Sequence, residues 1–354
     1  MKVSMSRAAT LMVVACLLAT GVAWAQSPAV NPTEAKDAAQ QAAQQRAQPL
    51  NNQPVWNEVR SGAPQVTTVT GRETNILIQP QGQTWRAARV NLVSWGGLLF
   101  ALAVVGLAGF YLIRGPLTVE KKRGDRVIER FSPADRYAHW FLAIVWVALA
   151  ITGLLLSLGK IVLLPLIGPT LFSWLATLAK TLHNFIGPIL IIAVPWMFIR
   201  YVRDNGIGIE DFRWFANIIG YFKGHEYPSG RFNGGEKLVF WLVLVLFSTC
   251  LVVSGLVLVF PNFNQTRETM QLANIVHIVA AYLAIALACV HIYLGTVGST
   301  GAYRAMRDGY VDASWAEHHH QRWYQDIVAG KARQHFVQVD AAPTGTPVVQ
   351  SRAA

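Results

Sequence analysis

Residues 269–303, TMQLANIVHIVAAYLAIALACVHIYLGTVGSTGAY, contain no Asp, Glu, Lys or Arg, yet they include His277 and His291. A helix of about 20 apolar residues crosses a hydrocarbon core of about 30 Å. The stretch therefore predicts a transmembrane helix. An ionisable side chain inside such a helix is costly and is by default functional. This segment thus predicts both the fold class and where the chemistry lies.

Other uncharged stretches of similar length occur at residues 90–113, 137–159, 181–199 and 238–266. Over the whole chain only 14% of residues are charged and 53% are hydrophobic, whereas about 25% are charged in an average soluble domain. A freely soluble globular protein is therefore excluded. Because lipid offers no partner to a backbone amide, the spans must be helical. We expect an all-α, polytopic membrane helix bundle with five spans in the mature chain.

The basic residues predict the orientation of this bundle. Segments 114–136 and 200–237 and the tail after residue 303 hold seven, six and six Lys or Arg, against two in 160–180 and one in 261–271. Cytoplasmic loops carry such an excess. The pattern predicts a multi-pass protein of the bacterial inner membrane, with the mature N-terminus periplasmic and the C-terminus cytoplasmic. The net charge of +11 is thereby explained without a nucleic-acid partner.

The uncharged stretches and the charges of the connecting segments together divide the chain into six parts. They are a signal peptide (1–25), a partly disordered periplasmic extension (26–91), an extra transmembrane helix (92–113), a cytoplasmic basic loop (114–136), a four-helix core (137–300) and a cytoplasmic tail (301–354). The uncharged stretch 161–179 would add a sixth span. It is interrupted by Pro165, Gly168 and Pro169, so we expect it at the outer interface.

The spans contain four of the nine histidines, at two predicted depths. His139 comes early in a span that starts inside, and a helix cap at Ser132, with Pro133 and Asp135 after it, would place it near the cytoplasmic surface. His291 comes late in a span that ends inside. His183 and His277 come early in spans that start outside. The four therefore form an inner pair and an outer pair.

Two facing imidazoles at each depth suit two b-type haems with both axial positions filled, an arrangement for electron transfer. His277 and His291 are 14 residues apart, about 21 Å and just under four turns of helix, so they lie on nearly one side of it. Small residues, namely Gly187, Ala281 and Gly295, stand four positions after three of the ligands and would make room for the haem. Close helix packing is the alternative for them. Zinc is disfavoured because it prefers four close ligands.

From the pattern alone, two other accounts of the four histidines stay open. The histidines would serve as a proton relay in a proton-coupled transporter or sensor, or they would form hydrogen bonds between helices.

The sequence motifs add a resemblance to a known family. RYAHW (136–140), LHNFIG (182–187), RFNGGEK (231–237), the His277/His291 spacing and HHxxWY (319–324) resemble the cytochrome b, or gamma, subunit of respiratory formate dehydrogenase over about residues 130–331.

The resemblance implies a site and partners. His139 and His291 would hold the cytoplasmic-side haem iron, and His183 and His277 the periplasmic-side one. Menaquinone or ubiquinone would bind beside the inner haem, near Asn233 and His291. An iron-sulfur beta subunit and a molybdenum or tungsten catalytic alpha subunit would dock outside, and a higher oligomer of this heterotrimer stays open.

The chain itself would not oxidise formate but would pass electrons to quinone. Related alternatives are the cytochrome b subunits of hydrogenase and thiosulfate reductase. The family core has four spans, so the first mature span is an extension.

Several polar residues each have two possible roles. Glu236 would pass a proton inward or complement a helix dipole, and Asn233 would be a plain loop residue without the resemblance. Arg136 and Arg200 would pair with haem propionates or anchor the inner face.

The remaining histidines lie outside the spans. The run His318–His320 would bind a metal or, as we expect, belong to a solvated or partner-docking segment. His225 and His335 are expected to be solvated.

Overall fold

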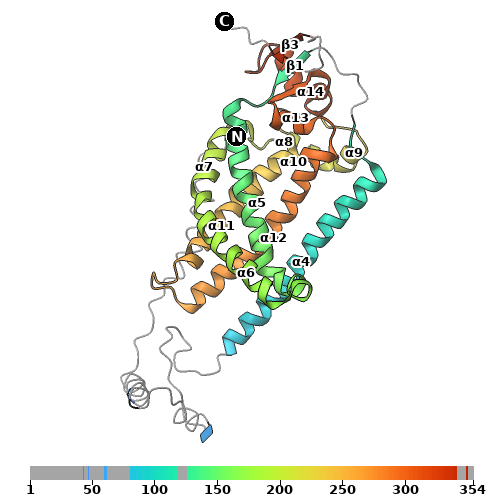
Figure 1. Cartoon of the computed structure of the whole chain (residues 1–354). Helices are drawn as coiled ribbons and strands as arrows, with labels where there is room; N and C mark the ends of the chain where they lie inside the picture. The colour runs from blue at the N-terminus through green and yellow to red at the C-terminus, as the bar shows by residue number, and fades with distance from the viewer. Residues whose placement is uncertain are drawn as a thin grey trace. The chain divides into compact units, whose positions relative to one another are not determined.

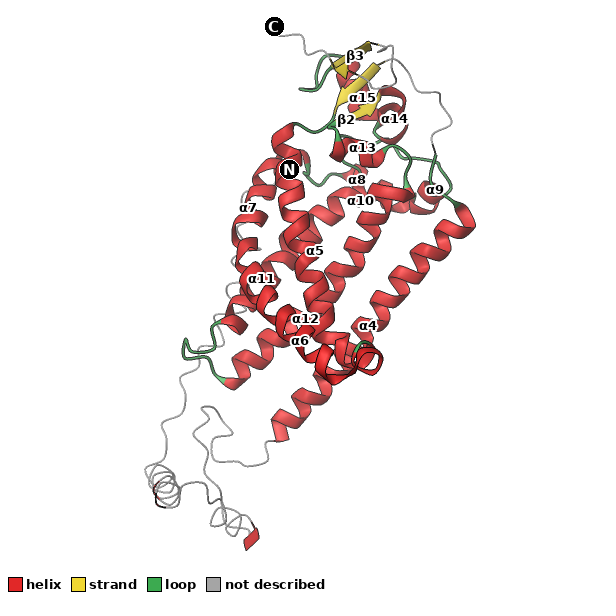
Figure 2. Cartoon of the chain, viewed as in Figure 1, coloured by secondary structure: helices red, strands yellow, loops and turns green. Residues whose placement is uncertain are grey.

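The computed structural model describes residues 80–118, 126–340 and 348–349, together with the single positions 43, 47, 60 and 61. The expected signal peptide and most of the periplasmic extension lie outside the described residues, as do 119–125 of the basic loop and most of the last 14 positions of the tail. Figures 1 and 2 show that the described part is mostly helical.

The helical elements carry the labels of Figure 1. In chain order they are α4 (Pro80–Arg114), α5 (Pro133–Val162), α6 (Leu164–Ile186), η1 (Gly187–Ile189), α7 (Leu190–Tyr201), η2 (Val202–Asp204), α8 (Ile209–Ala216), α9 (Ile218–Phe222), α10 (Gly234–Leu238), the π-helical η3 (Val239–Phe247), α11 (Ser248–Val259), α12 (Arg267–Tyr293), the π-helical η4 (Leu294–Gly298), α13 (Ala302–Arg307), α14 (Ala313–His319) and α15 (Gln321–Val328).

Five helical segments in the described part of the chain are long and apolar enough to cross a membrane. They are Thr84–Arg114, Pro133–Val162, Leu164–Asp204, Gly234–Val259 and Arg267–Gly298. This confirms the predicted polytopic helical bundle. The first of them includes residues expected in the extension, because α4 begins at Pro80, before the apolar run.

The stretch 161–179, expected at the outer interface, is helical and joins the third span. A single residue, Leu163, separates α5 from α6. Gly168, at φ 76° and ψ 169°, then interrupts the helix, a conformation that glycine adopts at no steric cost. After this break the helix continues to Ile186. The stretch therefore adds no sixth span in the described residues.

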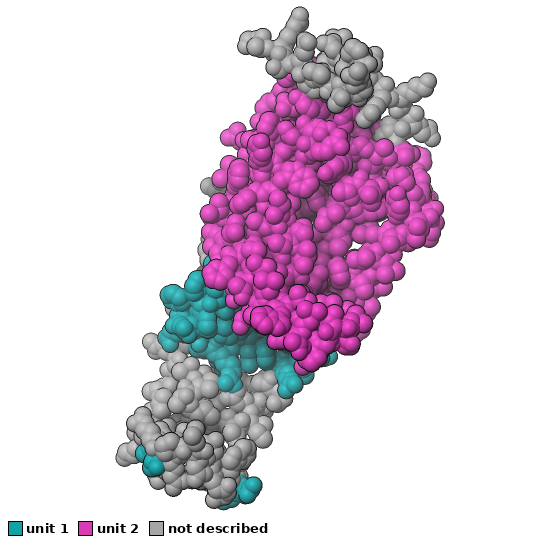
Figure 3. Space-filling view, viewed as in Figure 1, with its two compact units in different colours: residues 1–94, 253–278 teal, residues 95–252, 279–354 magenta. Residues whose placement is uncertain are grey.

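The chain divides into two compact units, which Figure 3 colours separately. One comprises residues 1–94 and 253–278, so its described part includes the start of α4, the end of α11 and the first part of α12. The other comprises residues 95–252 and 279–354 and contains the rest of the spans and the folded tail. Each unit is considered by itself below.

The tail of the larger unit is folded, which the sequence did not predict. Its strands form a small antiparallel sheet in the order β2-β1-β3-β4, namely β2 (Tyr310–Asp312), β1 (Arg126–Glu129), β3 (Phe336–Asp340) and β4 (Val348–Val349). In Figure 2 these strands gather with α13–α15 at one end of the unit. Ile128 and Val311, paired across the sheet, are fully buried. The described parts of the basic loop and of the tail thus share one apolar core, which includes Trp315 and Trp323 of the tail.

The predicted start of α5 is confirmed. Ser132 is the N-cap residue and Pro133 the first helical residue. The Ser132 hydroxyl accepts a hydrogen bond from the Asp135 amide at 3.3 Å, and the Asp135 carboxylate accepts one from the Ser132 amide at 3.2 Å. The same carboxylate accepts two bonds from the Arg200 guanidinium, at 2.5 and 2.8 Å. This pairing gives Arg200 a protein partner and ties α7 to the start of α5.

The segment of α4 from Trp95 onward packs closely on the core of its own unit. A Cβ added at Gly96 would lie 2.2 Å from the ring of Tyr282 on α12, and one at Gly97 would lie 2.9 Å from Leu158 on α5. Beyond the helix, the Leu117 amide donates to the Gly298 carbonyl at 2.8 Å. The extra helix is therefore an integral part of this unit.

Candidate haem-binding site

His139 on α5 and His291 on α12 face each other, as the sequence predicted for the inner pair. Their ring centroids are 6.2 Å apart and the rings are inclined by 53°. Metal–imidazole bonds are about 2.0–2.1 Å long and a ring centre lies about 1.2 Å behind its nitrogen, so two imidazoles on opposite sides of one iron have centroids about 6.4 Å apart. The observed separation fits two axial ligands of one haem.

The surroundings of this pair also suit a prosthetic group. The side chain of His291 is exposed, although its ring faces that of His139 on another membrane helix. The Nδ1 atom of His139 is buried, and it has no hydrogen-bond partner among the residues that the structure describes. Trp140 packs edge-on against His139 and donates from Nε1 to the Met306 carbonyl at 3.0 Å. The two histidines thus have ring nitrogens that would bind a metal.

His183, on α6, is oriented by Thr152 on α5. The Thr152 hydroxyl lies 2.8 Å from Nδ1 of His183 and donates to the Ala148 carbonyl, also at 2.8 Å. A hydroxyl has one hydrogen, so we assign the imidazole hydrogen to Nδ1. The nitrogen without a hydrogen is then Nε2, which is the form that binds a metal.

His277, on α12, has the same type of contact in the other unit. Its Nδ1 atom lies 3.0 Å from the hydroxyl of Ser254 on α11. Ser254 is 4% exposed and Thr152 is 8% exposed, so both hydroxyls are buried. A hydrogen bond from the second ring nitrogen fixes the tautomer and orientation of a metal-binding histidine. The two histidines predicted for the outer haem are both held in this way.

A glycine follows each of these hydroxyl residues. A Cβ added at Gly153 would lie 3.3 Å from Cε1 of His183, and one at Gly255 would lie 3.4 Å from Cε1 of His277. Each imidazole therefore rests against the backbone of the preceding helix. The sequence patterns considered above did not include these four residues. The signal was a Thr-Gly and a Ser-Gly pair, each inside the apolar span before a histidine.

The glycines that the sequence did select have open surroundings. A Cβ added at Gly187 or Gly295 meets no atom of the described residues within 4 Å. Gly187 is the C-cap of α6, and Gly295 lies in η4. The structure thus gives no support to close helix packing as their role, and haem packing stays a prediction.

Asn233, predicted to contact quinone, is buried and caps α10. Its side-chain oxygen accepts a hydrogen bond from the Glu236 amide at 3.0 Å, and the Glu236 carboxylate accepts one from the Asn233 amide at 3.0 Å. Arg130 donates to Glu236 at 2.9 Å. Glu236 is therefore the N3 residue of a capping box. Within the described residues, Asn233 forms its side-chain hydrogen bond through its oxygen, which leaves its side-chain amide for a ligand.

Two tail histidines expected to be solvated are buried. His320 is 1% exposed, its Nδ1 lies 2.9 Å from the Gly230 carbonyl and its Nε2 is 3.8 Å from Glu236. Burial lowers the pKa of His320 to about 3, with a further contribution from Arg130. His319 is 6% exposed. The expectation of solvation was wrong for them because the tail folds back onto residues 226–236, but it holds for His225 and His335, which are exposed.

Comparison with known proteins agrees with this geometry. The family profile of prokaryotic cytochrome b561 matches residues 130–309. A formate dehydrogenase cytochrome b556(fdo) subunit of Escherichia coli is 32% identical over 215 residues, covering 58% of this chain and 95% of the relative. The nitrate-inducible formate dehydrogenase cytochrome b556(Fdn) subunit of the same species is 28% identical over 221 residues, or 59% and 96% of the two chains.

A formate dehydrogenase cytochrome b556 subunit of Haemophilus influenzae is 27% identical over 238 residues, or 64% of this chain and 94% of the relative. The profile covers half of the chain and includes all four membrane histidines, and the relatives match over nearly their whole lengths. The protein is thus a multi-pass membrane cytochrome b. It belongs to the prokaryotic cytochrome b561 family, within which it is a cytochrome b subunit of the formate dehydrogenase type.

Proposed function

We propose that the chain carries electrons from a periplasmic iron-sulfur subunit, through two b-type haems, to menaquinone or ubiquinone in the membrane. Two histidines would hold each haem and would leave no open position for a substrate, so the haems would supply reversible one-electron transfer. The iron-sulfur beta subunit and a molybdenum or tungsten alpha subunit would oxidise formate. The observation that carries the proposal is the 6.2 Å separation of the rings of His139 and His291.

The protein's own residues would hold and orient these groups. His139 and His291 would bind the cytoplasmic-side iron, and His183 and His277 the periplasmic-side iron. Thr152 and Ser254 support the second assignment, because each would keep Nδ1 of its histidine engaged and direct Nε2 to the metal. The direction of electron flow follows from docking of the dehydrogenase outside.

Quinone would bind beside the inner pair, next to His291 and the start of α10. The carboxamide of Asn233 would donate to a quinone oxygen, since its own oxygen already caps the helix. Glu236 lies between Arg130 and His320, at 2.9 and 3.8 Å. This cluster, in which Arg130 and His320 are buried and Glu236 is half-buried, would deliver the protons that quinone reduction consumes at the cytoplasmic end. Formate oxidation outside and proton uptake inside would together build a proton-motive force.

The test is an optical redox titration of the full chain in its complex, extracted without denaturation. Two b-type components should be present, and His139→Ala should remove one of them, while His225→Ala, at an exposed position, should retain both. Formate should reduce both components when the partner subunits are present. A single haem in the unmodified protein, or two in the His139→Ala variant, would refute the proposal.

A further inference from the structure

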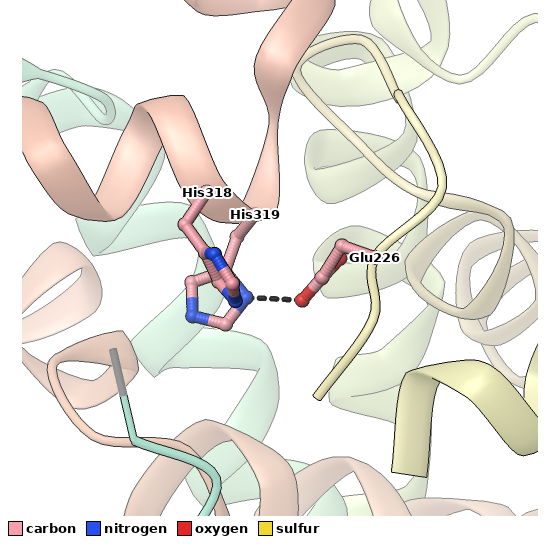
Figure 4. A group of neighbouring side chains, drawn as sticks. All are labelled: Glu226, His318 and His319. Atoms are coloured by element: carbon pink, nitrogen blue, oxygen red, sulfur yellow. Dashed lines mark hydrogen bonds and ion pairs between the residues drawn. The ribbon is translucent and has the colours of Figure 1, made fainter. Parts of the chain in front are cut away.

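A second group of potential metal ligands lies apart from the membrane histidines, at the folded tail. Glu226 lies in the segment between α9 and α10, and His318 and His319 end α14. One ligand atom from each of the three residues lies within 4.8 Å of the others. Figure 4 shows ring nitrogens of both histidines directed at the Glu226 carboxylate. Two segments about 90 residues apart in sequence therefore bring three ligand side chains to one point.

Two of these side chains are buried with unsatisfied atoms. Glu226 and His319 have side chains that are each 7% exposed, and the Glu226 carboxylate contacts Nδ1 of His319 directly. The second oxygen of Glu226 and Nε2 of His319 are buried, and within the described ranges neither has a hydrogen-bond partner. A buried polar atom without a hydrogen-bond partner is costly, so a bound cation that engaged either atom would relieve this arrangement.

Hydrogen bonds of the surrounding backbone hold together the two segments that carry these ligands. The Ser229 hydroxyl donates to the His319 carbonyl at 3.1 Å, and the Arg322 amide donates to the Ser229 carbonyl at 3.1 Å. These bonds join the segment after Glu226 to α14 and α15. The ring of Trp315 packs against His319 with centroids 4.7 Å apart and forms an apolar wall. These contacts hold the segment after Glu226 beside α14 and α15 and position the ring of His319.

We propose that Glu226, His318 and His319 bind a divalent transition-metal ion, with zinc as the best match. Two imidazoles and a carboxylate are typical zinc ligands, and three protein ligands leave a fourth position for water. Ligand atoms around a tetrahedral zinc ion are about 3.4 Å apart for bonds of about 2.1 Å. The observed ligand atoms, which all lie within 4.8 Å of one another, would adjust to that spacing by side-chain rotation.

The ion would join residues 226–229 to the end of α14. His320 follows directly and approaches Glu236, so the same connection would hold the cluster near Asn233 in place. The expected effect of the ion is to hold together these two segments, which lie far apart in the sequence. The inference does not depend on the electron-transfer proposal, since it uses none of the four membrane histidines.

Metal analysis of the full chain in its complex, purified with an affinity tag that lacks histidine, tests the proposal. After equilibration with micromolar zinc and removal of free metal, the unmodified protein should retain one zinc ion per chain. His318→Ala and Glu226→Gln should each weaken zinc binding by at least about tenfold. His225→Ala, one position before Glu226 and exposed, is the matched control and should bind as the unmodified protein does.

A second measurement guards against misfolding of the variants. Zinc added to metal-depleted protein should raise the melting temperature of the unmodified chain and of His225→Ala, because a ligand that binds only the folded state stabilises it. It should leave His318→Ala and Glu226→Gln unchanged, while both keep the haem spectrum of the parent. Absence of zinc from the unmodified protein, or equal zinc in all variants, would overturn the proposal and leave the contact as a hydrogen bond between Glu226 and His319.

Discussion

The hydroxyl of Thr152 lies 2.8 Å from Nδ1 of His183, and it connects α5 to the helix that carries a predicted haem ligand. Ser254 makes the corresponding contact with His277 in the other unit. The repetition of a hydroxyl residue followed by glycine at both positions indicates that the two histidines have the same requirement. We propose that this requirement is a ring held at Nδ1, so that Nε2 would bind iron.

Removal of the Thr152 hydroxyl should therefore change one haem selectively. In Thr152→Val, which keeps the shape of the side chain, loss of the Nδ1 partner makes the imidazole a weaker donor. We expect the midpoint potential of the outer haem to rise and its affinity to fall about 10- to 100-fold. Thr152→Ser retains the hydroxyl and is the control. Redox titration of the reduced absorption band checks this, and identical titrations of the two variants would contradict it.

The four histidines should act as two pairs. His183→Ala and His277→Ala should lose the same spectral component, and His139→Ala and His291→Ala the other, because one missing axial bond leaves the haem weakly held. Low-temperature difference spectra of the four variants measure this. The pairing is wrong if His139→Ala and His183→Ala remove the same component.

Asn233 should have two separable roles. Asn233→Ala removes the N-cap and should cost about 1 kcal/mol of stability, in addition to slowing quinone reduction. Asn233→Ser keeps a capping oxygen but lacks the carboxamide, so it should retain stability and both haem bands while it slows quinone reduction. Formate-dependent quinone reduction and thermal unfolding are measured together. Normal quinone reduction by Asn233→Ser would limit Asn233 to the capping role.

The close contact of α4 with Tyr282 predicts an unequal response of two glycines on one helix. Gly96→Ala places a Cβ against the Tyr282 ring and should destabilise the chain by about 1–3 kcal/mol, as overpacking does. Gly106→Ala meets no described atom within 4 Å and should have little effect. Thermal unfolding in detergent compares the two, and equal melting temperatures would show that α4 does not depend on this contact.

The orientation of the chain can be tested with a reporter that is active only in the periplasm. Fusions at Gln53 or Asn264 should be active, whereas fusions at Asp125, Gly224 or Gly330 should be inactive, because the basic segments are expected to stay inside. Activity at Gly224 would mean that the third span does not return the chain to the cytoplasm. In that case His183 would not lie at the outer face.

The sequence by itself determined the spans, the cap at Ser132 and the positions of the four membrane histidines. These features are local, since a long run of apolar residues favours a membrane helix and a hydroxyl residue before a proline favours the start of a helix. The depth and spacing of the histidines favoured two haems, and the resemblance added the quinone site at Asn233 and the partner subunits. Neither local patterning nor the motifs indicated that the tail would fold over residues 226–236.

Only the tertiary structure decided which side chains meet. Thr152 and His183 are 31 residues apart, and Glu226 and His319 are 93 residues apart. Nothing in the neighbourhood of either residue in the chain specifies the other, because such contacts depend on helix rotation and on the packing of separate segments. For the same reason His319 and His320 looked like solvated tail residues. Their burial follows from the apolar core that Ile128, Val311 and Trp315 form between the basic loop and the tail, and that core exists only once these distant segments pair.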